Sequence, residues 1–87
     1  MDLSDRILGA AHKYCARHEA DLQQSSVCGC FYCKKTFAPD EIEVWIEETP
    51  RTAVCPRCGI DAVIGSASGY PVSDDMFLAA MHSYWFE

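Results

Sequence analysis

Six cysteines offer the clearest chemistry in this 87-residue sequence. Four of them form two pairs, and two residues lie between the cysteines of each pair: Cys30 and Cys33, then Cys55 and Cys58. Twenty-one residues lie between the two pairs. A two-residue spacing lets a tight turn bring both sulfurs to one metal while backbone amides of the turn hydrogen-bond to the thiolates. The pattern therefore predicts one structural Zn²⁺ held by four thiolates, with no open position for water or substrate.

The remaining cysteines leave alternatives open. Cys28 lies two residues before Cys30 and could replace it as a ligand or hydrogen-bond to the cluster, although a spare thiol agrees better with the CxxC turn geometry. Cys15 lies between His12 and His18, but on a helix these histidines are about 120° apart, so the three side chains cannot face one ion. A contact between Cys15 and one of the histidines stays open.

Catalysis has less support in the sequence. A zinc-stapled ββα nuclease needs a histidine between or just after the cysteine pairs, and residues 34–74 contain none. His82 and Asp61 form an acid–base pair only if the fold brings them together, which nothing in the sequence requires. We therefore expect no enzyme; a small enzyme using His82, or Cys15 with His18, is the weakest alternative.

The segments around the cysteines must position them. A helix is expected over roughly 4–24, capped by Ser4 or Asp2, because its few apolar residues recur near helical spacing. Residues 41–47 alternate strictly, which predicts a strand with one half-buried face. That face would carry Ile42, Val44 and Ile46.

Further strands are expected at 52–54, after a turn over 48–51, and at 62–64, which would complete a small antiparallel sheet carrying the metal. A loop over 65–71 then leads to a second helix that begins at Ser73 as its cap. Gly59 directly follows the second cysteine pair and permits the positive φ that such turns often need. The fold class is thus small α+β, a zinc ribbon built from an antiparallel hairpin with two CxxC knuckles and flanked by two helices. One domain spans 1–87, with the N-terminal helix in 1–25, the ribbon in 26–65, and the loop and C-terminal helix in 66–87.

Charge and composition narrow the class of protein. Seven basic and thirteen acidic residues give a net charge of −6, and a zinc tetrathiolate would bring it to about −8. Such a field opposes binding to phosphate backbones, so nucleic acid is a disfavoured partner. The first residues do not resemble a secretory signal, and no stretch approaches the ~18 apolar residues of a membrane span. A cytoplasmic location is expected, where cysteines serve as metal ligands more often than as disulfides.

Three surfaces are candidates for contacts. The C-terminal helix carries more apolar surface than a chain of this size easily covers, which predicts a protein partner or a homodimer. The aromatic residues that are candidates for a protein contact surface are Trp45, Tyr84, Trp85 and Phe86. A small basic group could bind phosphate or an acidic peptide, or merely offset the charge of the metal centre: Lys34, Lys35, Arg51 and Arg57. An acidic ridge suits a basic partner or is a solvated face: Asp40, Glu41, Glu43, Glu47 and Glu48.

Four stretches, CFYC, EIEVWIEE, CPRCGIDAVIG and MHSYWFE, together resemble a group of small bacterial and phage-borne zinc-ribbon proteins that are usually labelled only as cytoplasmic. The likeness covers roughly residues 28–87. It implies the ribbon and its four ligands, and no established activity. The expected function is a structural-zinc module for protein interaction or regulation, without catalysis. A zinc-ribbon regulator that binds nucleic acid is the alternative.

Overall fold

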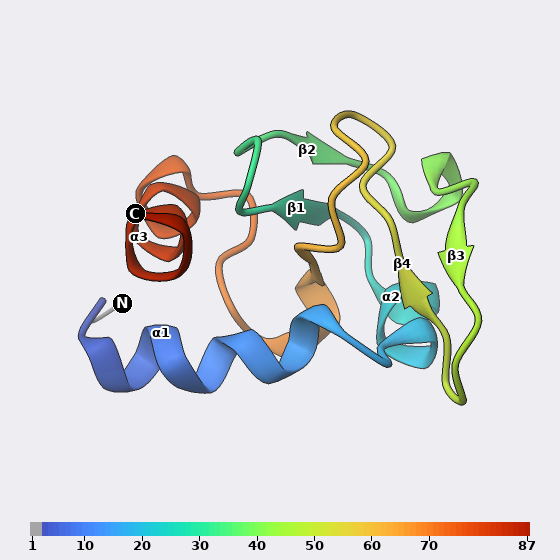
Figure 1. Cartoon of the computed structure of the whole chain (residues 1–87), viewed down its shortest axis with the longest axis horizontal. Coiled ribbons are helices and arrows are strands. Elements are labelled where there is room, and N and C mark those ends of the chain that lie inside the picture. The colour runs from blue at the N-terminus through green and yellow to red at the C-terminus, as the bar shows by residue number, and fades with distance from the viewer. Residues whose placement is uncertain (1–2) are drawn as a thin grey trace.

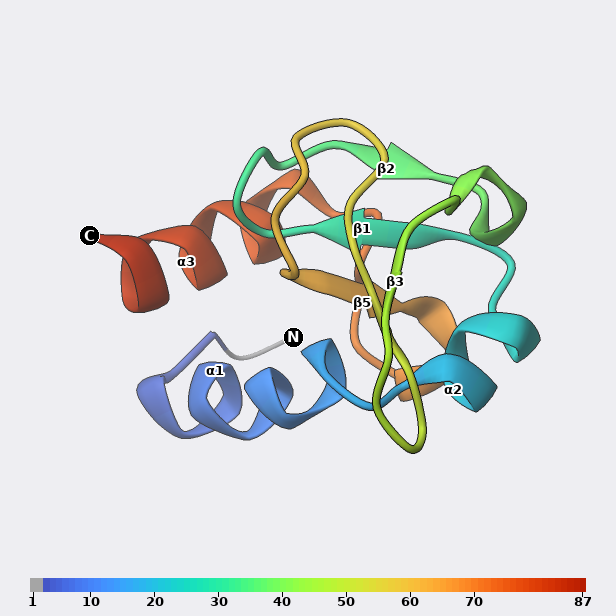
Figure 2. The same ribbon diagram turned by 45° about the vertical axis from the view of Figure 1, so that its right-hand side comes forward.

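The computed structural model describes residues 3–87 as a small α+β protein in which three α-helices surround two antiparallel sheets. The first sheet has the strand order β2-β1-β5, and the second is the hairpin β3-β4, which crosses in front of the first in Figure 2. Figure 1 places α3 and α1 at one end of the molecule and the hairpin with α2 at the other. The strands are β1 (Cys28–Cys30), β2 (Thr36–Phe37), β3 (Trp45–Ile46), β4 (Thr52–Ala53) and β5 (Val63–Gly65).

The N-terminal segment is not the single helix expected over 4–24. It forms α1 (Asp5–Ala11), a 3₁₀ turn at His12–Cys15 and α2 (Glu19–Gln24), and the chain is non-helical between the turn and α2. Arg17 has a φ of 52°, and this conformation frees its amide to donate to Thr52 Oγ1 at 2.7 Å. Hydrogen bonds to β4 thus replace helical ones. Ser4 stands at the N-cap without a side-chain cap bond, and Asp2 lies outside the described residues.

His18 completes this connection between the N-terminal segment and β4. Its buried ring donates from Nδ1 to the Tyr14 carbonyl at 2.6 Å and accepts at Nε2 from the Ala53 amide at 3.0 Å. These two partners require the neutral ring, because a proton on Nε2 would face the Ala53 N–H. Burial lowers the pKa of His18, against smaller opposite effects of the Tyr14 hydrogen bond and the Asp21 charge.

The depressed pKa of His18 predicts a loss of stability in acid. Because the unfolded ring takes up a proton near its ordinary pKa of 6.5 and the folded ring does so only at lower pH, the contribution of His18 is complete above pH 6.5 and falls as pH drops below it. His18→Gln keeps an acceptor for Ala53 and does not titrate. The free energy of unfolding of the wild type should therefore decrease relative to that of His18→Gln below about pH 6.5 in urea titrations. If the free energies of unfolding of the wild type and of His18→Gln changed with pH in the same way, this assignment would be contradicted. Protonation of the thiols affects both proteins equally and therefore cancels in the comparison.

The β3-β4 hairpin corrects the expected strand over 41–47. Only Trp45–Ile46 are extended and paired, and a 3₁₀ turn occupies Pro39–Glu41. The buried face is also reversed beyond Ile42: Val44 is 60% and Ile46 40% exposed, whereas Trp45 is half-buried. The reason is the register, which pairs Trp45 with the fully buried Ala53 and so directs Trp45 inward.

The expected third strand, at 62–64, is present one residue later as β5. It pairs with β1, and not with the β3-β4 hairpin as a single sheet would require. Strand β1 was not expected, because Cys28-Gly29-Cys30 has the composition of a ligand loop. All residues of β1 and β5 are buried, so this pair forms the centre of the core.

Helix α3 (Asp75–Phe86) closes the core at the other end. Its N-cap is Asp74, whose side chain accepts from the Met76 amide at 2.9 Å, and not Ser73 as expected. The fully buried residues of α3 are Phe77, Leu78 and Met81. Within residues 3–87, the helices are too short or too polar to cross a lipid bilayer.

Candidate metal centre

The two CxxC loops are built in the same way. In the first, the Cys30 amide donates to the Lys35 carbonyl at 3.0 Å and the Lys34 amide to the Cys30 carbonyl at 2.8 Å. In the second, Cys55 bonds to Ile60 and Gly59 to Cys55, both at 3.0 Å. The two CxxC loops therefore have the same pattern of backbone hydrogen bonds.

Each loop contains one residue in the left-handed region, at the position after its second cysteine. Gly59 has a φ of 81°, as the sequence predicts, and Lys34 has a φ of 65°. A non-glycine residue pays about 1–2 kcal/mol for this conformation because its Cβ approaches the backbone. The first loop therefore carries a local cost that the second loop avoids.

Exchanging residue types at these two positions should change stability in opposite directions. Lys34→Gly removes the strain and is expected to stabilise the protein by about 0.5 kcal/mol, after the greater freedom of glycine in the unfolded chain is subtracted. Gly59→Ala should destabilise it by about 1 kcal/mol through strain alone, since no atom lies within 4 Å of the added Cβ. Denaturant unfolding at fixed metal concentration measures both. Lys35→Ala controls for lost charge, and equal signs for the two loop variants would contradict the prediction.

The four paired cysteines come together in one cluster. Their sulfurs all lie within 4.8 Å of one another, with Sγ distances of 3.7 Å from Cys30 to Cys58 and 3.8 Å from Cys33 to Cys55. A tetrahedral metal with bonds of about 2.3 Å to sulfur needs about 3.8 Å between its ligands, whereas a disulfide needs about 2.05 Å. The donor set and its spacing therefore fit a metal ion, as the sequence predicted.

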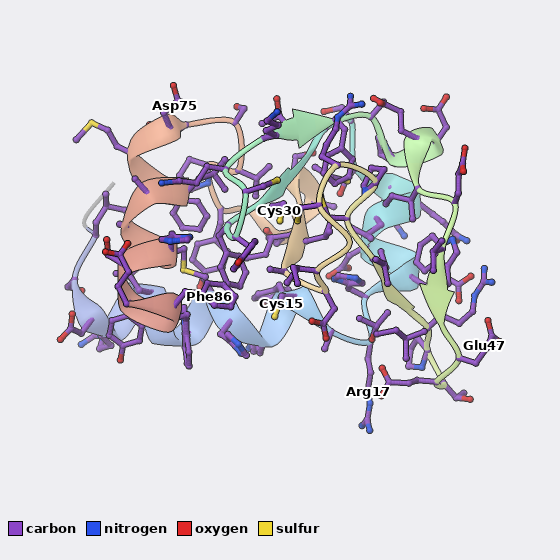
Figure 3. The ribbon with its side chains drawn as sticks, turned by 45° about the horizontal axis from the view of Figure 1, so that its top comes forward. Cys15, Arg17, Cys30, Glu47, Asp75 and Phe86 are labelled. Atoms are coloured by element: carbon purple, nitrogen blue, oxygen red, sulfur yellow. The ribbon has the colours of Figure 1, made fainter. Side chains whose placement is uncertain are left out.

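Burial and hydrogen bonds from backbone amides affect the pKa values of Cys30 and Cys33 differently. Cys30 and Cys55 are buried, whereas Cys33 and Cys58 are more accessible; Figure 3 shows Cys30 in the middle of the molecule. Burial raises the pKa of Cys30. Partial burial also acts to raise the pKa of Cys33, but hydrogen bonds from the Lys35 amide and from neighbouring thiols outweigh it and lower that pKa. The amide of Arg57 donates to Cys55 Sγ at 3.3 Å, so amides of both loops stabilise thiolates.

Cys28 and Cys15 do not belong to this cluster. Among the described residues, the four cysteines above are the cysteine, histidine or carboxylate side chains that lie close enough together to hold a metal ion. Burial raises the pKa of both Cys15 and Cys28 to about 11. His12 lies against the Trp85 ring, with centroids 3.9 Å apart, so the structure does not gather the His12, Cys15 and His18 set.

Two members of the predicted basic group have carboxylate partners. Arg51 donates to Glu19 and stacks on the Trp45 ring at 4.9 Å, while Arg57 contacts Glu41 at 2.6 Å. Lys34 and Lys35 are exposed on the first CxxC loop. The four cations are therefore not one free phosphate-binding patch, because half of their charge is compensated locally.

The predicted contact aromatics are divided between the two ends of the molecule. Trp85 donates from Nε1 to the Leu8 carbonyl at 3.2 Å, and Phe86 packs on Phe31 and Tyr32 of the first CxxC loop. These side chains and Tyr84 stay about 40% exposed. Trp45 lies in the hairpin at the opposite end, so the four do not form one surface.

His82 has a structural position that the sequence did not reveal. Its Nδ1 lies 3.2 Å from the Phe31 carbonyl, and its Nε2 lies 3.4 Å from Glu87. Because Phe31 lies between Cys30 and Cys33, this contact connects α3 to the first CxxC loop. No local pattern marks it, since fifty-one positions separate the two residues.

A groove of about 460 Å³ beside Cys55 is a further feature that sequence reasoning missed. The exposed side of Val44, opposite Val54, forms part of its wall. The only sequence signal is the pair of β-branched residues, Val44 and Val54, next to the two strands, and the expected burial of Val44 concealed it. The groove is lined by Glu41, Glu43, Val44, Val54, Cys55, Pro56, Arg57 and Gly59.

Comparisons of the chain with protein-family models, curated proteins and solved structures find no match. The geometry of the four cysteines and of the surfaces around them is thus the basis for a functional proposal.

Proposed function

We propose that this protein is a zinc ribbon with two CxxC knuckles whose single, structural Zn²⁺ supports a module for protein interaction or regulation. The observation that carries the proposal is the cluster of four sulfurs, two pairs of which stand 3.7 and 3.8 Å apart as a zinc tetrathiolate requires. Cys30, Cys33, Cys55 and Cys58 would hold the ion. The chemistry it supplies is cross-linking of the two loops.

Chain length supports a structural role for the metal. A domain of this size buries a smaller fraction of its surface than larger domains do, and its stability is correspondingly marginal. Zinc binding to four thiolates contributes about 10–16 kcal/mol in small zinc modules, similar to the whole stability of a typical domain. His18 bonds to Ala53 of β4, which leads into the second loop, and His82 of α3 contacts Phe31 of the first loop. The ion would therefore stabilise segments beyond the loops themselves.

The absence of catalysis is part of the proposal. Four protein ligands fill a tetrahedral zinc site and leave no position for water. Cys15 is buried with a raised pKa and is therefore a poor nucleophile. Both ring nitrogens of His18 are occupied by backbone partners, and His82 contacts the Phe31 carbonyl. None of the histidine and cysteine candidates proposed for catalysis thus has a free reactive group beside a substrate site.

Interaction with another protein is favoured over nucleic acid by charge and exposure. The net charge is −6, and Arg51 and Arg57 already contact carboxylates. Several large apolar side chains are nevertheless accessible at both ends of the molecule: Tyr32, Val44, Ile46, Met76, Tyr84, Trp85 and Phe86. Exposed apolar and aromatic groups of this kind are typical of protein contact surfaces.

Native mass spectrometry combined with elemental analysis tests the proposal. We expect one zinc per chain and loss of the folded circular dichroism spectrum when a strong chelator removes it. A coloured, iron-containing protein would contradict the choice of zinc, since iron is the other metal that takes four thiolates in this geometry. A metal-free chain that stays folded would contradict the structural role altogether.

A further inference from the structure

The outer edge of β3 has unpaired backbone groups. Val54 donates its amide to the Val44 carbonyl, whereas the Ala53 amide turns away from β3 to His18. Trp45 is the partner of Ala53 in the register of the two strands, and the two residues do not hydrogen-bond to each other. In an antiparallel pair, the N–H and C=O groups of such residues point away from the partner strand. The Trp45 amide and carbonyl therefore point to the free side of the strand.

This edge carries only part of the protection that is usual for an edge strand: β3 is short and has Glu43 and Glu47 beside it, but it has no lysine or proline and, in the part of the chain that the structure describes, no covering strand. Edge strands are usually shielded by lysine, proline, a bulge or a covering segment, because an open edge pairs with other chains. Residues 41–47 contain neither lysine nor proline. Figure 1 shows β3 at the outer margin of the molecule, and no strand of the described residues pairs with its far side. Exposed Val44 and Ile46 add an apolar face to this open edge.

The groove beside Cys55 shares Val44 with that apolar face. Its lining includes the apolar residues Val44, Val54 and Pro56 and the acidic residues Glu41 and Glu43. Arg57 neutralises Glu41, but Glu43 has no cationic partner within residues 3–87. The groove can therefore accept an apolar side chain whose neighbours are positively charged.

The charges along the β3-β4 hairpin indicate which kind of strand can pair with the free edge of β3. Glu43 is exposed at one end of β3 and Glu47 at the other; Figure 3 shows Glu47 at the margin of the molecule, far from α3. Arg51 lies 3.7 Å from the Glu47 carboxylate and offsets part of its charge, whereas Glu43 has no such partner within residues 3–87. Antiparallel pairing with a second copy of β3 would still bring Glu43 close to Glu47 of that copy, and like charges opposed across strands are destabilising. A basic strand would place opposite charges there.

We propose that the β3 edge binds an extended, basic segment of another protein by strand addition. The backbone of that segment pairs with Trp45, one apolar side chain enters the groove at Val44 and Val54, and lysine or arginine residues face Glu43 and Glu47. This inference rests on the proposed function, because it names the surface and the partner chemistry of the interaction module.

Titration of the metal-loaded full chain with short synthetic peptides, followed by amide NMR shifts, tests the inference. The probes are a capped Lys-Val-Lys-Val-Lys-Val peptide, its Glu-Val counterpart, and a Lys-Val peptide with alternate amides N-methylated. We expect the plain Lys-Val peptide to shift the amides of Val44 and Trp45 and to bind at least about tenfold more tightly than either of the others. Glu43→Lys should weaken its binding by a similar factor, and Asp75→Asn, an exposed change on α3, should not.

Several results would overturn the inference. These are equal binding of the acidic peptide, shifts confined to the α3 aromatics, no shift at millimolar peptide, or a stable dimer that Val44→Lys dissociates. The metal content of the same samples separates the two proposals. A chain with one zinc that ignores the peptides retains its metal role and loses this partner, whereas a chain without zinc fails the proposed function first.

Discussion

Replacement of Cys30 by alanine is expected to leave the chain largely unfolded at 25 °C. The buried Cys30 sulfur is one of four within 4.8 Å, and its removal would leave the proposed tetrahedral zinc site with three ligands. Tetrathiolate zinc contributes about 10–16 kcal/mol in small modules, so losing most of it exceeds the stability that an 87-residue core supplies alone. Loss of bound zinc and of amide dispersion in the NMR spectrum are the measurements.

Cys28→Ala is the matched control for this variant. Cys28 lies two residues away in the same strand, is equally buried, and stands outside the sulfur cluster. Its replacement removes one buried sulfur and should cost about 1 kcal/mol without changing the metal content. A folded Cys30→Ala chain that still binds one zinc would contradict the assignment of Cys30 as a ligand. Unfolding of both variants to the same degree would show that packing in β1, and not the metal, is decisive.

Gly29→Ala is expected to destabilise the protein by about 3 kcal/mol, although it adds only a methyl group. A Cβ at position 29 would lie well inside van der Waals contact distance of the Val72 carbonyl oxygen and 3.1 Å from Leu78 Cδ2. The backbone at Val72 cannot move freely, because it passes across the buried β1 strand. A decrease in melting temperature of about 12 °C or more should follow for a domain of this size.

Gly9→Ala provides the comparison, since it adds the same methyl group where there is room. Its Cβ would meet only the Tyr84 hydroxyl, at 3.8 Å, in the interior of α1. Alanine favours helix over glycine, so this variant should gain about 0.5–1 kcal/mol. If thermal unfolding gave Gly29→Ala the same melting temperature as the wild type, the close approach of Val72 to β1 would be wrong.

The metal cluster was predictable because its determinants are local. The separation of Cys30 from Cys33, and of Cys55 from Cys58, sets the distance between sulfurs through the covalent geometry of one turn. The position after each second cysteine follows from the same turn, which is why Gly59 was recognised. Lys34 was not recognised at the equivalent position, because a lysine gives no signal of a positive φ.

Features that depend on contacts between distant residues could not be derived in this way. The alternation in residues 41–47 predicted a strand of which only Trp45–Ile46 is present, and both faces of that segment contain apolar residues. Pairing of Trp45 with Ala53 decided which face turned inward and left Val44 exposed beside a groove. In the N-terminal segment, helical spacing continues past the point where Arg17 and His18 bond to β4, thirty-five residues away.

The sequence by itself thus determined the cluster of four cysteines, the positions of β4 and β5 to within about one residue and the C-terminal helix, since these follow from spacing and periodicity over a few residues. Tertiary structure alone decided that Cys28 and Gly29 belong to a central strand, that the N-terminal helix is broken, and that the β3 edge is open. The physical reason is that burial and hydrogen-bond pairing are settled by competition among non-local partners, such as Val72 against β1 and His18 against Ala53.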